Sequence, residues 1–150
     1  KRLERLTDEY SGVQDIAIEF AKGLVNLSHK QDEQGASETI QRLERFIDEY
    51  PGMQDIAIEF AKGLFNLSNK QDGQGASETV KRLERLTDEY SGVQDIAIAF
   101  AMGLVNLSFK QDKQKAPSTI NQIKALAAKH PDNDKIAHFL NYAQNAFDSR

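Results

Sequence analysis

The feature that most constrains this chain is a repeat with a period of 40 residues. Residues 1–40, 41–80 and 81–120 align with one another without a gap, and residues 121–150 align with them as a diverged fourth unit. Repetition at this period is typical of solenoids, in which each unit buries its apolar surface only by stacking on its neighbours. The units therefore predict a single helical-repeat domain that covers residues 1–150.

The first half of each unit has the pattern of a helix with one apolar stripe, and we call it the B segment. In the second unit it runs from about Ser37 to Tyr50, and charged residues occupy its other sides. It ends at Pro51-Gly52, because proline disfavours helix in the preceding residue and glycine accepts a left-handed turn. The stripe follows the i, i+3, i+4 spacing of a one-sided helix: Ile40, Leu43, Phe46, Ile47 and Tyr50.

The second half of each unit, the A segment, is apolar around most of its circumference. In the second unit it runs from about Gln54 to Lys70, and a QD-rich loop separates it from the next B segment. A helix of this kind is buried on several sides, so it must contact its own B segment and both neighbouring units. Gly63 recurs as Gly23 and Gly103, and since glycine costs about 1 kcal/mol in a helix interior, close helix packing is indicated. We expect an all-α fold of about eight helices, paired antiparallel in an αα-superhelix.

These residues resemble the tetratricopeptide repeat family. Pro51 and Pro131 lie where that family has a proline after its second helix, although Ser11 and Ser91 replace it in units one and three. The period is longer than the family's own, with the additional residues around Ser68–Ala76. Packing positions of the family's two helices are matched by Ala57, Phe60, Ala61 and Leu64, and by Ile40 and Leu43. The resemblance implies a right-handed superhelix that binds peptides or protein segments in a concave groove lined by the A segments.

Composition excludes several classes of function. The 19 basic and 23 acidic residues are interspersed, so the chain lacks the basic patch of a nucleic-acid-binding protein. No apolar run approaches the roughly 20 residues that cross a membrane. Cysteine is absent, which excludes disulfides and is compatible with a reducing compartment such as the cytoplasm.

No motif supports a reaction, a metal or a cofactor. The histidines His29, His130 and His138 do not have the spacing of three or four converging zinc ligands. The acidic pair Asp48-Glu49 recurs in other units, as expected of a solvated surface rather than of a catalytic pair. No glycine-rich phosphate loop is present, so we expect a protein that is not an enzyme and carries no cofactor.

Differences between the units point to one face of the A segments. The first 30 residues of units one and three differ at three positions only, where Glu19, Lys22 and His29 become Ala99, Met102 and Phe109. At 100° per residue these positions share the narrow polar side of the helix, which we call the A face. One interpretation is that each unit is tuned for a partner; the other is neutral drift at exposed sites.

The A face also carries an invariant asparagine and an apolar end. Asparagine recurs once per repeat and could hydrogen-bond the main chain of an extended peptide, or bond to a neighbouring helix instead. In the last two units the A face becomes apolar, which is typical of interaction sites. The predicted groove residues are Glu19, Lys22, Asn26, Glu59, Lys62, Asn66, Met102, Asn106, Phe109, Phe139 and Tyr142.

The two ends of the chain differ in pattern. In the last unit polar residues replace apolar stacking positions, which predicts a capping repeat: His138, Asn141, Gln144 and Asn145. The chain opens directly on a B segment, so we expect the C-terminal part of a longer array, whose open end could associate with another copy. The leading functional prediction is a protein- or peptide-binding module. The alternative is a structural spacer or self-assembling scaffold without a groove ligand.

Overall fold

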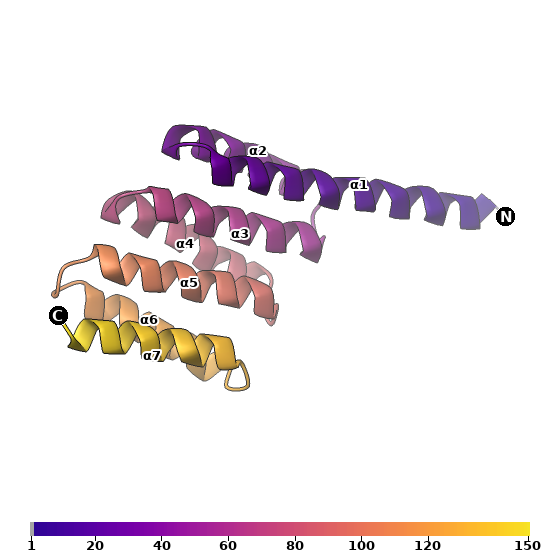
Figure 1. Ribbon diagram of the computed structural model, residues 1–150. Helices are drawn as coiled ribbons and strands as arrows, with labels where there is room; N and C mark the ends of the chain where they lie inside the picture. Colours follow the sequence, from indigo (N-terminus) through magenta and orange to yellow (C-terminus); the bar gives the residue numbers. More distant parts are fainter. Residues whose placement is uncertain (1) are drawn as a thin grey trace.

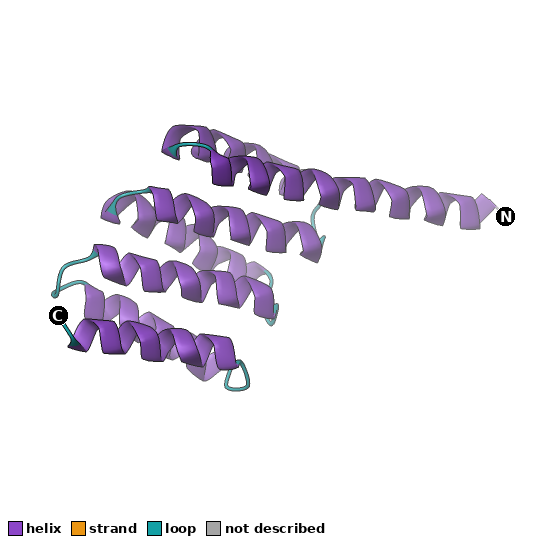
Figure 2. Ribbon diagram, in the orientation of Figure 1, coloured by secondary structure: helices purple, strands orange, loops and turns teal. Residues whose placement is uncertain are grey.

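The computed structural model describes the backbone from Arg2 to Arg150 and the side chains from Gly12 onward. This part of the chain forms seven helices and no strand (Figure 2). The helices are α1 (Arg2–Lys30), α2 (Glu33–Glu49), α3 (Gln54–Lys70), α4 (Gly73–Glu89), α5 (Gln94–Lys110), α6 (Ala116–Lys129) and α7 (Asp134–Asp148).

The helices form two layers that alternate along the chain. The A helices α1, α3, α5 and α7 make one layer, and the B helices α2, α4 and α6 lie behind it (Figure 1). Successive A helices contact each other and the B helices that flank them, whereas the backbones of the B helices do not contact one another. The all-α helical-repeat fold is therefore confirmed, and the A layer is its continuous part.

The core lies between the two layers and repeats with the sequence. Ile56, Ile96 and Ile136 occupy equivalent places on successive A helices, and each is fully buried. Leu43, Leu83 and Ile123 do the same on the B helices. Burying one such side chain contributes about 1.5–3 kcal/mol. The stabilisation of the array therefore grows with each unit that stacks.

The predicted QD-rich loop is a short turn, and the B helices begin earlier than expected. Helix α2 starts at Glu33 rather than near Ser37 because Asp32 caps it, its side chain accepting a hydrogen bond of 2.8 Å from the Gly35 amide. The Gln31 Oε1 accepts a second hydrogen bond of 2.6 Å from the buried Thr39 hydroxyl. The same pair of contacts recurs at Asp72–Gly75 and Gln71–Thr79. Some of the additional residues around Ser68–Ala76, which make the period longer than that of the tetratricopeptide repeat, thus form the first turn of a B helix.

A break equivalent to that at Pro51-Gly52 does not form at Ser11-Gly12, so the described residues form seven helices rather than the expected number of about eight. Gly52 and Gly92 adopt φ values of 81° and 85° and end the preceding B helices, whereas α1 continues through Gly12. Residues 1–18 and 81–98 are identical in sequence, so packing decides the difference. Helix α4 packs between α3 and α5, and no A helix precedes residues 2–11 in the structure. The predicted stripe residues of that segment, Leu3, Leu6 and Tyr10, lie outside the described side chains.

A cation at or just beyond the end of α3, α5 and α7 caps the carboxyl end of the A helix before it. Lys110 Nζ donates hydrogen bonds to three carbonyl oxygens at the end of α3, those of Ser68, Asn69 and Gln71, at 2.7, 3.1 and 2.6 Å. Lys70 donates to a carbonyl at the end of α1, and Arg150 to two at the end of α5. These three residues are 40 positions apart. These cations thus provide hydrogen-bond donors for the free carbonyl groups at the ends of α1, α3 and α5, and they interact favourably with the negative ends of the three helix dipoles.

Replacing Lys110 with methionine tests this contact between A helices. Methionine keeps most of the aliphatic stem but leaves three carbonyl groups at the end of α3 without their donor. We expect Lys110→Met to lower the free energy of unfolding by about 1–2 kcal/mol, measured by urea denaturation. The control Lys124→Met changes an exposed lysine of α6 and is expected to stay within about 0.5 kcal/mol of the parent.

The recurring glycine of the A helices provides a second test. A Cβ atom added at Gly63 would lie 2.5 Å from Ile40 Cδ1, but one added at Gly23 would meet nothing within 4 Å. Because Ile40 is fully buried, we expect Gly63→Ala to destabilise the fold by about 1–3 kcal/mol. In the single chain, where such a Cβ meets no atom, Gly23→Ala should be neutral or stabilising by up to about 1 kcal/mol, through helix propensity. Equal thermal midpoints for the two variants would contradict the packing described here.

Candidate functional site

The A face is one surface that continues from helix to helix. The Asn106 side-chain amide of α5 donates a hydrogen bond to the Asn69 side-chain oxygen of α3. One unit further, the rings of Phe109 on α5 and Tyr142 on α7 pack edge to face with their centroids 5.6 Å apart. In both cases the position equivalent to His29 contacts the polar side of the next A helix. Of the predicted groove residues, Phe109 and Tyr142 thus contact each other, while Asn106 contacts Asn69, which the sequence did not single out.

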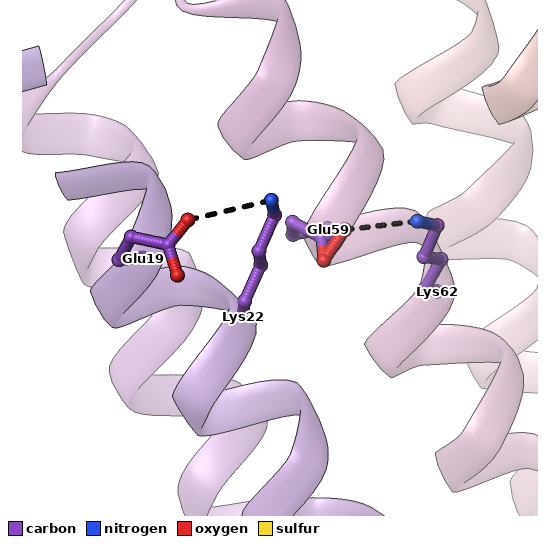
Figure 3. Close-up of polar contacts among 4 residues, drawn as sticks. All are labelled: Glu19, Lys22, Glu59 and Lys62. Atoms are coloured by element: carbon purple, nitrogen blue, oxygen red, sulfur yellow. Dashed lines mark hydrogen bonds and ion pairs between the residues drawn. The ribbon is translucent and has the colours of Figure 1, made fainter. Parts of the chain in front are cut away.

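The first two units present a charged part of this surface. Lys22 pairs with Glu19 at 3.5 Å on α1, and Lys62 pairs with Glu59 at 3.1 Å on α3 (Figure 3). The Glu19 side chain is 75% exposed, but that of Glu59 is only 9% exposed. The difference follows from packing, because α3 has an A helix on each side whereas α1 has one. Glu59 is thus less accessible to a partner than the sequence suggested.

The last two units present an apolar part. Phe109 is 40% exposed and Tyr142 is 55% exposed. Met102 and Phe139 are half-buried, and Phe139 packs against the core. Ala99, which the sequence placed in this apolar patch, is buried instead. The accessible apolar surface is therefore mainly the Phe109–Tyr142 pair, and exposed aromatic pairs are common anchors in binding sites.

The invariant asparagines have different environments. Asn26 is exposed, whereas Asn66 and Asn106 are half-buried. The Asn106 amide is used within the fold, in its hydrogen bond to Asn69. A bond to a neighbouring helix, the alternative to peptide binding, therefore accounts for the side-chain amide of Asn106. The three residues do not form a uniform ladder.

Two hollows lie between the B helices, where the sequence indicated no site. One of about 400 Å³ lies between α2 and α4, and its lining includes Pro51, Phe60 and Arg82. Another of about 860 Å³ lies between α4 and α6, beside Phe100 and His130. They arise because adjacent B helices stand apart, and an Arg82–Glu44 ion pair bridges the first gap. No sequence pattern marks such a gap, since it depends on helix spacing.

The environment of Lys110 shifts its pKa. Burial lowers the pKa of Lys110, and the carboxylates of Asp72 and Glu33 partly oppose this effect. This lysine caps a helix rather than facing a cavity. From Gly12 onward no three histidine or carboxylate side chains gather in a group that could hold a metal ion. No helix in the described part combines the length and apolarity required to cross a membrane.

The polar residues predicted for the capping unit lie on accessible sides of α7. His138, Asn141 and Asn145 are exposed and Gln144 is half-buried, whereas the equivalent Ala21, Leu24 and Val25 of α1 are buried. In α1 these positions pack on the helices that follow. In α7 no helix of the structure follows, and polar side chains at these positions remain hydrated.

Neither protein-family models nor curated proteins nor solved structures give a significant match to this chain. The architecture itself defines the class, which is an all-helical repeat protein whose neighbouring helices pack in two layers. Its candidate site is the A face, charged on α1 and α3 and aromatic on α5 and α7.

The ion pair on α3 can be tested by exchanging it for the residues of the next unit. Lys62→Met alone removes the partner of the nearly buried Glu59 carboxylate. We expect a loss of about 1 kcal/mol in the free energy of unfolding, because a poorly hydrated charge loses its counter-ion. Glu59→Ala/Lys62→Met reproduces the Ala99/Met102 pair and should recover most of that loss.

The equivalent pair on α1 is the matched control. Glu19 and Lys22 are both well exposed, and exposed ion pairs contribute about 0–1 kcal/mol. Lys22→Met should therefore leave the urea midpoint nearly unchanged. A larger effect at Lys22 than at Lys62 would show that burial of Glu59 is not the cause.

Proposed function

We propose that the chain is a non-enzymatic binding module that holds a peptide or protein segment along the A face. Its two-layer stack of paired helices, with the A helices in continuous contact, supports a likeness to the tetratricopeptide repeat family. In that family the equivalent helices line a peptide-binding groove. The proposal extends this role to α3, α5 and α7 of the present chain.

The observation that carries the proposal is the exposed aromatic pair on α5 and α7. Phe109 and Tyr142 stack on each other, yet 40% and 55% of their surfaces remain accessible. Aromatic side chains supply much of the binding energy in protein interfaces. A pair that is held by two adjacent helices also loses little conformational freedom on binding.

The surroundings of the pair indicate the chemistry of the ligand. A large apolar side chain of the ligand would cover Phe109 and Tyr142, near the half-buried Met102. The neighbouring Asn69 and Asn106 offer polar groups to a main chain. Charges on α1 and α3 are already paired within the protein, so they would orient a ligand more than hold it.

A structural spacer or self-assembling scaffold is the competing function. In that case the A face would have no ligand, and the aromatic pair would serve only to pack α5 against α7. The two functions differ in what removal of the pair does, because only a binding module loses a ligand.

A peptide-display screen of the chain tests the proposal. We expect enriched peptides to contain a large apolar residue and to bind with micromolar affinity. Phe109→Ala/Tyr142→Ala should weaken the binding of each enriched peptide at least roughly 30-fold, since the loss of two interface rings removes about 2 kcal/mol or more. Fluorescence anisotropy measures the affinity, and circular dichroism verifies that the variant is folded.

Phe20→Ala is the matched control for this screen. Phe20 is 48% exposed, similar to the pair, but it lies on α1 and packs against Phe46 of α2. Its removal should leave peptide affinity unchanged. If no peptide is enriched, or if the aromatic double variant binds as tightly as the parent, the A-face assignment is wrong and the scaffold function is favoured.

A further inference from the structure

A second surface of the chain exposes side chains that the other repeats bury. Ile16 is 72% exposed and Phe20 is 48% exposed on α1. Their equivalents one unit on, Ile56 and Phe60, are 0% and 6% exposed. The next equivalents, Ile96 and Phe100, are buried to the same degree. An element that covers this face in units two and three is thus missing from α1.

The missing element is a B helix. Phe60 lines the gap between α2 and α4 and has a B helix on each side. Phe20 has Phe46 of α2 on one side, with ring centroids 5.1 Å apart, and no B helix on the other. The place for that helix is vacant at Gly23, since an added Cβ meets nothing within 4 Å there. At Gly103 the same atom would meet Leu83 at 3.1 Å and Val80 at 3.3 Å.

The chain contains a segment with the right sequence for this place. Residues 1–18 are identical to residues 81–98, and in that second copy α4 folds back on α5 through the turn at Gly92. In α1 the helix instead runs straight through Ser11 and Gly12. Figure 1 shows that the N-terminal half of α1 extends beyond the rest of the stack. A straight helix carries the segment away from the face that it matches.

We propose that a second copy of this chain covers the exposed face of α1. The two α1 helices lie antiparallel and cross near Gly12, and residues 2–11 of each copy take the vacant B-helix place beside Gly23 of the other. Each copy thereby gains contacts equivalent to those that α4 makes with α5 from Arg82 onward, and the exchange is closed by a two-fold axis.

This dimer uses α1 and leaves the aromatic pair of α5 and α7 free, so it is independent of the peptide-binding proposal. It also explains why one sequence has two conformations. The turn at Gly92 is stabilised by burial of α4 between two A helices. For residues 2–11 the structure offers one A helix, and the straight form gains a second chain instead.

Sedimentation equilibrium of the chain tests the dimer directly. We expect a reversible dimer and a rise in its dissociation constant of roughly 100-fold or more in Ile16→Lys, because each copy loses a buried apolar side chain. The substitution leaves the monomer fold intact since Ile16 is mostly exposed. Tyr142→Lys, at the opposite end of the array, is the control and should dimerise like the parent. A parent chain that stays monomeric at high concentration would overturn the proposal.

Two substitutions at the crossing separate the straight helix from the turn. Ser11→Pro introduces the proline of the second unit and favours the bend, so we expect weaker dimerisation. Gly12→Ala removes the left-handed conformation seen at Gly92 and favours the straight helix, so dimerisation should be as strong as in the parent or stronger. Equal dimer affinity in Ser11→Pro and Gly12→Ala would show that the straight α1 is not required.

Crosslinking distinguishes exchange between chains from folding back within one chain. The protein has no cysteine, so Leu3→Cys/Gly23→Cys carries the only two thiols. Their equivalents in unit three, Leu83 and Gly103, are adjacent. In the exchanged dimer a short thiol crosslinker joins two chains, and a covalent dimer appears on a denaturing gel. An intrachain product alone would mean that residues 2–11 fold back on their own α1 and that no second copy is needed.

Discussion

The structure depends on the burial of A helices that are apolar around most of their circumference. Each inner A helix needs contacts on three sides, which α3 and α5 obtain from the flanking B helices and from the A helices before and after them. Isolated pairs of helices could not satisfy this requirement. The 40-residue period and the two-layer stack both follow from it.

Polar contacts reinforce the same stacking direction. The cations at positions 70, 110 and 150 each bond to the carboxyl end of the preceding A helix, so the helix dipoles are satisfied across the A layer. Asp32 and Asp72 cap the B helices at the same end of the stack. These bonds join units that are adjacent in space, and they fix the spacing at which the apolar surfaces meet.

The proposed binding sites lie on surfaces that remain exposed after the helices have stacked. The A face changes from ion pairs on α1 and α3 to an aromatic pair across α5 and α7. A second free surface exists on α1, where Ile16 has no covering B helix. We propose a ligand with an apolar side chain for the first surface and another copy of the chain for the second.

Much of the fold could be predicted because the sequence repeats. The bounds Gln54–Lys70 and the buried faces of Ile56 and Leu43 follow from apolar periodicity, which tertiary packing preserves. The start of α2 at Glu33 was not predicted, because it depends on side-chain hydrogen bonds of Asp32 and Gln31. Residue types alone do not show that these bonds form. The candidate site stays a prediction, and the accessibility of two of its positions differs from what the sequence suggested. Ala99 and Glu59 are buried, and such burial depends on helix spacing.

The identical segments 1–18 and 81–98 separate what the sequence determined from what the tertiary structure decided. The sequence by itself determined that both segments are helical and that each has an apolar stripe, because these properties depend on local propensity and spacing. Whether Ser-Gly forms a turn or continues a helix was decided by the tertiary structure. The turn at Gly92 forms where α4 can be buried between α3 and α5, and α1 remains straight where only one A helix is present. Glycine in the sequence allows the left-handed conformation but does not require it. Burial of the folded-back helix provides the free energy that stabilises the turn over the straight helix.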